Sequence, residues 1–243
     1  MKTGIFKLEE NRKIAKNTYE WVLSGDTSDI SAPGQFVNIK LDGFYLRRPI
    51  SVCDVEGDKL TLIFKAVGAG TEKMASAEAG EEFDVMTGLG NGYSLEKSGG
   101  SPLLIGGGAG VPPMYLLARR LVALGKKVTV ILGFGSADEV FYTENFEKLG
   151  CKVIIATVDG TMGVKGFVTD AMSELSYSYF YTCGPEPMLK AIYNASTSEG
   201  EFSFEERMGC GFGACMGCSC ETKYKYKRIC RDGPVLEKEE IVW

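Results

Sequence analysis

The sequence predicts a multidomain fold with three parts. They are an antiparallel β-barrel over residues 1–98, an α/β domain with a doubly wound parallel sheet over residues 99–201, and a small cysteine-rich domain over residues 202–243. Short, partly alternating segments dominate the first part, which is typical of a barrel. Strand and helix patterns alternate in the second part, which indicates a parallel sheet. Five of the eight cysteines lie in the third part.

The first part contains four strand-like segments and one helix. The predicted strands are Thr18–Leu23, Gln35–Leu41, Ile50–Asp54 and Leu60–Lys65. Gly, Pro and Asp residues between them provide turns, so the segments can close into a small barrel. Thr71–Ala79 predicts a single short helix inside this part.

The second part alternates short apolar strands with longer helical segments. The predicted strands are Leu103–Ile105, Val128–Leu132, Val153–Ala156 and Tyr177–Thr182. The predicted helices are Pro113–Leu124, Phe141–Leu149, Phe167–Leu175 and Pro187–Ala195. Connections of this kind place parallel strands in one sheet with helices packed on it.

Composition excludes several classes of function. The 243 residues carry a net charge of −5 and no polybasic block, so we expect no nucleic acid partner. The basic residues of 223–231 are interpreted as a solvated face or as counter-charge to an anionic group. No apolar run is long enough to span a membrane. Eight cysteines without a secretory signal favour the cytoplasm. The absence of histidine excludes Rieske clusters, His-ligated haem or zinc, and Ser-His or Cys-His catalysis.

Four cysteines have the spacing of a plant-type [2Fe–2S] site. Cys210, Cys215 and Cys218 form a C-x4-C-x2-C pattern, and Cys230 follows later in the chain. Two irons need four thiolates, and three of them come from one loop. The glycines of that loop, Gly209, Gly211, Gly213 and Gly217, are expected to take positive φ angles and to bring backbone N–H groups close to the sulfurs. A cluster of this type transfers one electron at a time.

Other uses of these cysteines remain open at this stage. Structural zinc prefers two well-separated C-x2-C-like pairs, which this spacing fits less well. A disulfide framework is disfavoured by the size of the chain. Cys220 is a fifth thiol in the segment and is interpreted as a neighbour that is not a ligand, although it could substitute for Cys218.

Two loops of the second part suit a dinucleotide. The loop with Gly106, Gly108 and Gly110 follows a strand and opens a helix, where free N–H groups can bind pyrophosphate. The alternative is a bare strand–helix turn. The loop Cys183-Gly184-Pro185 also joins a strand to a helix and is expected at the same crevice. Cys183 would then lie near a nicotinamide, or it is simply a small buried cysteine.

The adenosine end of the nucleotide is expected near Gly133–Glu139. A 2′-phosphate would favour an arginine there, but the segment contains Asp138 and Glu139 instead. This favours NAD over NADP.

Two segments of the barrel suit a flavin nucleotide. Arg48 and Ser51 lie on one predicted strand, where a guanidinium can bind pyrophosphate and a hydroxyl can bond the edge of a flavin. Lys65–Thr71 ends a strand and enters a helix, which gives a second phosphate anchor at Gly70 and Thr71. The alternatives are an ordinary surface arginine pair and a hairpin turn.

Taken in order, Arg48-x-x-Ser51, Gly68-x-Gly70-Thr71, the glycine-rich loop and Cys183-Gly-Pro185 resemble the ferredoxin–NADP reductase superfamily. With the cysteine module added, essentially the whole chain resembles the electron transfer subunits of class B dihydroorotate dehydrogenases. The resemblance implies a β-barrel FAD domain, an NAD domain and a [2Fe–2S] domain. It also implies an FMN-containing catalytic subunit as partner, in a heterotetramer of two of each.

The resemblance also assigns residues. FAD would be held by Arg48, Pro49, Ile50, Ser51, Lys65, Ala66, Val67, Gly70 and Thr71, and the cluster by Cys210, Cys215, Cys218 and Cys230. The implied activity is electron transfer between NAD and the FMN of the partner through FAD and the cluster, in de novo pyrimidine (UMP) biosynthesis. No catalytic side chain is expected here, because the base for dihydroorotate belongs to the partner.

Two alternatives remain. One is the small subunit of another NAD(P)H:ferredoxin-type oxidoreductase or a hydrogenase-linked diaphorase. The other is a non-enzymatic redox sensor or a zinc-stabilised binding module.

Overall fold

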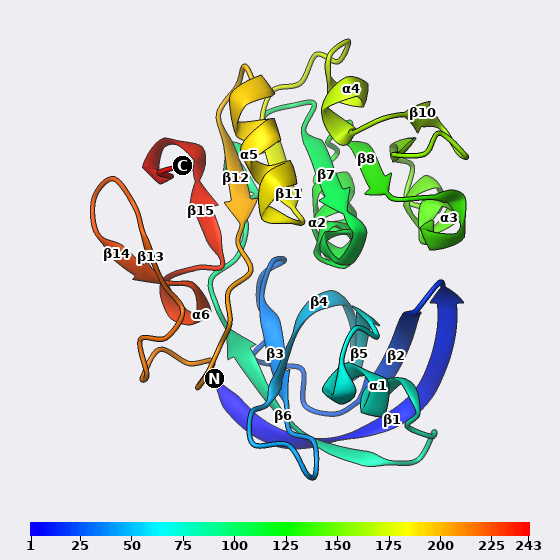
Figure 1. The fold of residues 1–243 in the computed structure, drawn as a ribbon, viewed down its shortest axis with the longest axis vertical. Helices are drawn as coiled ribbons and strands as arrows, with labels where there is room; N and C mark the ends of the chain where they lie inside the picture. Colours follow the sequence, from blue (N-terminus) through cyan, green and yellow to red (C-terminus); the bar gives the residue numbers. More distant parts are fainter.

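The computed structural model describes residues 1–243 and contains a barrel, a parallel sheet with helices on both faces, and a cysteine module beside them (Figure 1). The barrel strands are β1 (Lys2–Ala15), β2 (Thr18–Ser24), β3 (Phe36–Ile39), β4 (Arg48–Glu56), β5 (Lys59–Lys65) and β6 (Glu82–Leu89). They pair antiparallel in the closed order β1-β2-β5-β4-β3-β6. The predicted fold class is confirmed.

Buried side chains alternate along the barrel strands and form the barrel core. Trp21 and Leu23 of β2 and Leu60 and Leu62 of β5 are fully buried, because side chains two positions apart point to the same face. Strand β3 differs, since all four of its residues are buried. One of its faces therefore belongs to the barrel core, and the other is covered by the rest of the molecule.

The second sheet has seven strands in the order β10-β9-β8-β7-β11-β12-β15. Their bounds are β7 (Leu103–Gly107), β8 (Thr129–Phe134), β9 (Lys152–Thr157), β10 (Val164–Lys165), β11 (Phe180–Cys183), β12 (Gly200–Ser203) and β15 (Val235–Glu237). All neighbours pair parallel except β12 and β15, which pair antiparallel. Strand β15 thus attaches the end of the chain to the sheet.

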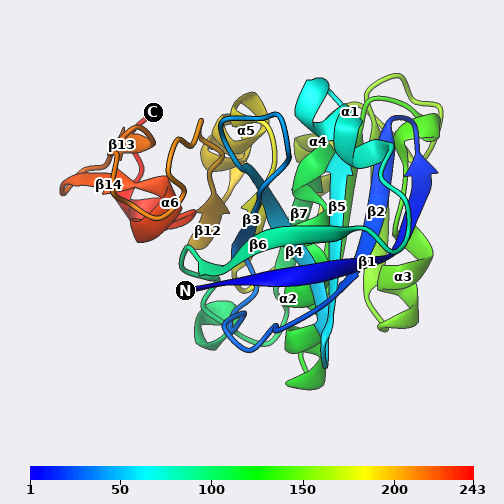
Figure 2. The same ribbon diagram turned by 90° about the horizontal axis from the view of Figure 1, so that it is seen from below.

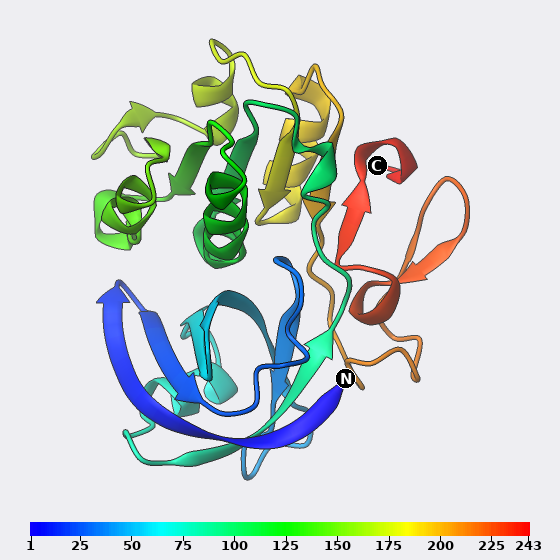
Figure 3. The same cartoon turned by 180° about the vertical axis from the view of Figure 1, so that it is seen from behind.

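Helices cover both faces of this sheet (Figure 3). Their bounds are α2 (Pro112–Ala123), α3 (Thr143–Lys148), α4 (Val168–Met172) and α5 (Glu186–Ala195). Leu117 and Phe146 pack α2 and α3 on one face, while Met172 and Ile192 pack α4 and α5 on the other. Pro112 and Pro113 lie in the first turn of α2, where a missing N–H costs nothing.

The cysteine module contains little regular structure. It has the hairpin of β13 (Ser219–Glu221) and β14 (Tyr226–Arg228), followed by α6 (Ile229–Asp232). Seen from below, it lies at one end of the molecule, next to β3 and β12 (Figure 2). Short 3₁₀ turns complete the chain at Glu96–Ser98, Gly108–Gly110, Ala137–Glu139 and Lys238–Glu240.

Several elements differ from the sequence-based expectation. The short helix of the barrel, α1, covers Ala69–Ala75 rather than Thr71–Ala79. Strands β1 and β6, which close the barrel, were not predicted. β1 carries many charged residues because much of it is exposed. No helix has the length and apolar character that crossing a membrane requires.

Candidate cofactor sites

A cavity of about 320 Å³ lies where the barrel, the parallel sheet and the cysteine module meet. Six of the predicted flavin residues line it: Pro49, Ile50, Ser51, Lys65, Val67 and Thr71. Strands β4 and β5 carry the first four, Val67 lies in the turn before α1, and Thr71 lies in the first turn of α1. The two barrel segments singled out in the sequence are therefore brought to one site.

Arg48, Gly70 and Ala66 lie beside this cavity. The Arg48 guanidinium lies over the Phe44 ring, 4.7 Å from its centroid, and a Cβ at Gly70 would overlap it. Gly70 is thus required for the close approach of Arg48 to α1. The Ala66 N–H is already bonded to the Asn17 carbonyl at 2.7 Å. Arg48 has no carboxylate partner, so its charge remains available to an anion.

Arg47, which precedes Arg48 in the sequence, has a different environment. Its Nη2 lies 2.8 Å from Asp84 Oδ2, and its Nη1 donates to the Asp84 carbonyl at 3.0 Å. Arg47 therefore joins strands of the barrel.

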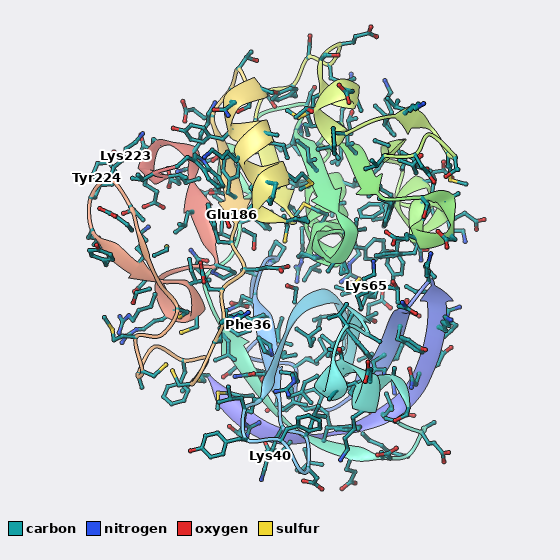
Figure 4. All side chains as sticks on the ribbon, in the orientation of Figure 1. Phe36, Lys40, Lys65, Glu186, Lys223 and Tyr224 are labelled. Atoms are coloured by element: carbon teal, nitrogen blue, oxygen red, sulfur yellow. The ribbon has the colours of Figure 1, made fainter.

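Acidic residues at the predicted adenosine end of the nucleotide contact lysines of the barrel. Lys65 Nζ lies 3.1 Å from Glu139 Oε1, and Lys16 Nζ lies 3.0 Å from Asp138 Oδ2. Figure 4 shows Lys65 between the barrel and the parallel sheet. These ion pairs join the two parts across the crevice.

The two predicted nucleotide loops are side by side. Strands β7 and β11 are parallel neighbours, and their register places Gly106 next to Cys183. A Cβ at Gly110 would overlap the Cys183 carbonyl, so the approach of the two loops requires glycine there. Cys183 is 1% exposed and packs in an apolar cluster, and burial raises the pKa of its thiol. This thiol is a buried packing group, and Gly184 and Pro185 follow it in the turn.

The four predicted ligand cysteines form two pairs. The Cys215 N–H donates to Cys210 Sγ at 3.4 Å, and the Cys210 N–H donates to Cys215 Sγ at 3.5 Å. The Cys230 N–H donates to Cys218 Sγ at 3.4 Å. No group of three or more His, Cys, Asp or Glu side chains is arranged around one metal ion. Two pairs suit a cluster with two thiolates on each iron better than a single zinc ion with four ligands.

The two pairs differ in their electrostatics. Burial disfavours the Cys210 thiolate, but hydrogen bonds from the N–H groups of Cys215 and Phe212 outweigh it and lower its pKa to about 6. Burial, and next its contact with Cys218, raises the pKa of Cys230 to about 12. The thiolate is the form that binds metal, so these backbone donors favour the metal-binding form of Cys210.

The expectation about loop glycines is only half right. Gly211 and Gly213 have φ of +78° and +91°, but Gly209 and Gly217 do not have positive φ, and Met216 does. Gly209 has another role: a Cβ there would lie 3.2 Å from Cys215 Sγ. It therefore allows the backbone to approach the sulfur.

Cys220 lies outside the two pairs. It is half-buried on β13, opposite Lys227 of β14, and lines a second cavity of about 400 Å³ next to Pro185 and Trp243. Its place in the hairpin fits the interpretation that it is not a ligand.

Several residues of the 320 Å³ cavity were missed in the sequence: Phe36, Ile63, Phe64, Ala109, Ser203, Phe204, Glu205, Glu206, Met208 and Pro234. Phe36 could have been found, because it alternates with the core residues of its strand. The residues of 203–208 and Pro234 carry no local pattern, since only the tertiary fold brings them to the barrel.

Comparisons with known proteins agree with this geometry. Residues 205–242 match the iron–sulfur cluster binding domain of dihydroorotate dehydrogenase B, and residues 104–194 match the oxidoreductase NAD-binding domain. Both matches confirm cofactors predicted from the sequence. Among solved structures, an NADH-dependent reduced ferredoxin-NADP oxidoreductase has a TM-score of 0.90 and 28% identity, covering 99% of this chain and 90% of that chain. A ferredoxin NADP+ reductase from Neisseria gonorrhoeae, with a TM-score of 0.70 over 80% of this chain and 90% of its own, shares the fold at 16% identity.

Curated relatives give the family. The dihydroorotate dehydrogenase B (NAD+) electron transfer subunit of Shouchella clausii is 44% identical over 99% of this chain and 98% of that protein. The protein of the same name from Fusobacterium nucleatum is 47% identical over 99% of both chains. The chain therefore belongs to the family of dihydroorotate dehydrogenase B (NAD+) electron transfer subunits.

Proposed function

We propose that this chain transfers electrons between NAD and the FMN of a dihydroorotate dehydrogenase catalytic subunit, in a heterotetramer of two copies of each. It is an NAD-linked oxidoreductase subunit of pyrimidine biosynthesis that uses FAD, a [2Fe–2S] cluster and NAD. FAD supplies the conversion between the two-electron hydride of the nicotinamide and the single electrons of the cluster. The residues of this chain hold and orient these groups.

The observation that carries this proposal is the position of the 320 Å³ cavity. Ala109 of the nucleotide loop and Met208, two residues before Cys210, both line it. A flavin held there by Pro49, Ile50, Ser51, Lys65 and Val67 lies between the nicotinamide and the cysteines. Such a position suits electron transfer between the nicotinamide and the cysteines in both directions.

We assign the remaining predicted residues by the same geometry. Arg48, with Gly70 and Thr71, binds the FAD pyrophosphate, and Ala66 shapes the turn between Lys65 and α1. Gly106, Gly108 and Gly110, with Cys183, Gly184 and Pro185, form the NAD crevice. Cys210, Cys215, Cys218 and Cys230 hold the cluster. The corresponding domains are residues 1–98, 99–201 and 202–243.

The catalytic subunit binds at the exposed side of the cluster loop. Phe212 and Met216 of that loop are 41% and 56% exposed, although they are large and apolar. Exposed apolar side chains beside a redox centre suit a protein contact that excludes water. We place the complex in the cytoplasm, which the eight unpaired thiols support.

The test is co-expression with a dihydroorotate dehydrogenase catalytic subunit, followed by purification and assay. We expect an FMN protein to co-purify and dihydroorotate to reduce NAD+ only when both subunits are present. We also expect NADH to reduce the bound flavin faster than NADPH at equal concentration, because Asp138 and Glu139 disfavour a 2′-phosphate. Dihydroorotate-dependent NAD+ reduction by the catalytic subunit alone would refute the proposal.

The second candidate is the small subunit of another NAD(P)H:ferredoxin-type oxidoreductase. The structural likeness at a TM-score of 0.90 favours it, but the identity of that pair is 28%, against 44–47% for the curated relatives. Co-purification with a large iron–sulfur flavoprotein in place of the FMN subunit would support this candidate.

A further inference from the structure

Both faces of strand β3 are buried along its whole length. Val37 and Ile39 point into the barrel core, so Phe36 and Asn38 point outward, towards the cysteine module. Asn38 is only 1% exposed. An amide buried on the outside of a barrel needs an explanation, because buried polar groups are almost always hydrogen-bonded.

Asn38 contacts the first cysteine of the cluster loop. Its Nδ2 lies 3.5 Å from the Cys210 carbonyl oxygen, across 172 positions of sequence. A Cβ at Gly211 would overlap the same amide nitrogen, and Gly211 has a φ of +78°. The loop thus turns directly over the Asn38 amide. The buried Asn38 Oδ1 has no hydrogen-bond partner, so the contact with Cys210 is the one hydrogen bond of this side chain.

The backbone of Asn38 is held in place from the barrel side. Arg47 Nη1 donates to the Asn38 carbonyl at 3.2 Å, while Arg47 Nη2 pairs with Asp84 at 2.8 Å. The strand register places Asn38 opposite Pro49, which lines the 320 Å³ cavity. Asn38, whose backbone is held in place, therefore connects the barrel strands beside the cavity with the loop of Cys210.

Phe36, on the same face, contacts the other half of the site. It lines the cavity and belongs to the apolar cluster that contains Cys218 and Cys230. Figure 4 shows Phe36 at the junction of the barrel and the cysteine module. One face of a short strand thus borders the cavity, the exposed cysteine pair through Asn38, and the buried pair through Phe36.

We propose that Asn38 is a positioning residue for the cluster. Its amide holds the Cys210 carbonyl and so fixes the loop of the exposed cysteine pair relative to the flavin cavity. Groups that orient the ligands of a metal site tune its spectrum and potential as well as its affinity. This inference rests on the proposed function, since it requires a flavin in the cavity and a cluster on the four cysteines.

The experiment compares two variants in the complex with the catalytic subunit. Asn38→Leu removes the amide at similar volume, and Asn38→Asp replaces the N–H donor with an oxygen that repels the Cys210 carbonyl. The readouts are FAD and iron content, the electron paramagnetic resonance (EPR) spectrum and midpoint potential of the reduced cluster, and the rates of flavin and cluster reduction after mixing with NADH.

We expect both variants to keep FAD and normal flavin reduction by NADH. We expect a changed EPR spectrum and potential, and electron transfer from flavin to cluster slowed about 10- to 100-fold. Loss of iron with retained FAD in both variants would also support the anchor. An unchanged spectrum, potential and transfer rate in both variants would overturn the proposal.

Asn91→Leu is the matched control. Asn91 also joins two parts of the chain, through bonds of 2.8 and 3.0 Å to the Val235 backbone, but it does not contact the cluster loop. We expect it to lower thermal stability and to leave the cluster spectrum unchanged. If Asn91→Leu changed the spectrum as much as the Asn38 variants, the effect would be general and the inference wrong. Failure of the proposed function would be seen separately, as a wild-type complex without flavin or cluster.

Discussion

The parallel sheet and the cysteine module are stabilised in different ways. In the sheet, Leu103, Ile105 and Ile131 are completely buried between helices. In the module, Phe212 and Tyr224 are exposed, and the segment between β12 and β13 has no regular structure. Apolar burial stabilises the sheet, whereas the loop of residues 204–217 buries almost no apolar side chain. We therefore expect metal binding to supply much of the free energy that orders this loop.

The comparison extends to the two cysteine pairs. Cys218 and Cys230 are 2% exposed and share an apolar cluster with residues of the sheet, whereas Cys210 and Cys215 lie on the exposed loop. With a cluster on these four cysteines, as we propose, the buried pair would anchor it to the fold, and the exposed pair would hold it near the surface that we assign to the catalytic subunit.

The largest expected effect is that of Cys215→Ser, which acts on the module alone. We expect loss of the cluster absorption and of electron flow to the partner, while FAD and its reduction by NADH remain. Visible absorption and iron content measure this. Cys151→Ser is the control, because Cys151 is buried in the sheet domain far along the chain from the loop. Retained electron flow through Cys215→Ser would contradict the ligand role.

Phe202→Ala should destabilise the sheet and leave the cluster in place, the reverse of Cys215→Ser. Phe202 is fully buried in β12, with its ring centroid 5.2 Å from that of Phe180. Removing a buried phenyl group lowers the free energy of unfolding by about 3–5 kcal/mol. Denaturant unfolding followed by circular dichroism measures the loss. At low temperature we expect the cluster spectrum to be unchanged. Loss of the cluster spectrum together with the loss of stability would contradict the claim that the sheet and the module are stabilised in different ways.

Arg48→Ala tests the barrel, which contributes the flavin cavity. Loss of a charge-assisted bond to pyrophosphate is expected to weaken FAD binding about 10- to 100-fold. Flavin content after dialysis and a titration of the apoprotein with FAD measure the change. Arg120→Ala, at an exposed position of α2, should retain wild-type flavin content. Equal flavin content in the two variants would remove Arg48 from the site.

The smallest expected effect is a pH dependence at Glu201. This residue is 4% exposed in β12, and its Oε2 accepts the Ser94 N–H at 2.9 Å. Burial raises the pKa of Glu201 to about 7, from its ordinary value of 4.5. The hydrogen bond from the Ser94 N–H and the charge of Lys97 oppose this shift, and Glu237 adds to it. The folded chain therefore binds more protons than the unfolded chain between these values, and its stability falls as pH rises through them.

Glu201→Gln removes the ionisation and keeps the acceptor for Ser94. We expect it to stabilise the chain relative to the wild type at pH 8 by on the order of 2 kcal/mol, and to have little effect at pH 4.5. Unfolding midpoints between pH 4.5 and 8 measure this. Glu174→Gln, at an exposed position that does not contribute to the shift of Glu201, is the control. The same pH profile for Glu201→Gln and the wild type would show that Glu201 does not cause the dependence.

The features that could be predicted from the sequence are those with a local pattern. Strands such as β2 and β5 and helices such as α2 were predicted because their apolar period is local. The Cys210–Cys230 spacing was equally local, and it identified the module. Strand β15 and the contact of Asn38 with Cys210 could not be predicted, because they join segments that are distant in sequence. Glu205 and Met208 were missed at the cavity for the same reason.

The most direct test of the account is the order of reduction after NADH is mixed anaerobically with the purified complex. Stopped-flow absorption distinguishes the flavin from the cluster. The account predicts that the flavin is reduced first and the cluster next, and that Cys215→Ser keeps only the first phase. Reduction of the cluster without prior reduction of the flavin would contradict the placement of the flavin between the nucleotide loops and the cysteines.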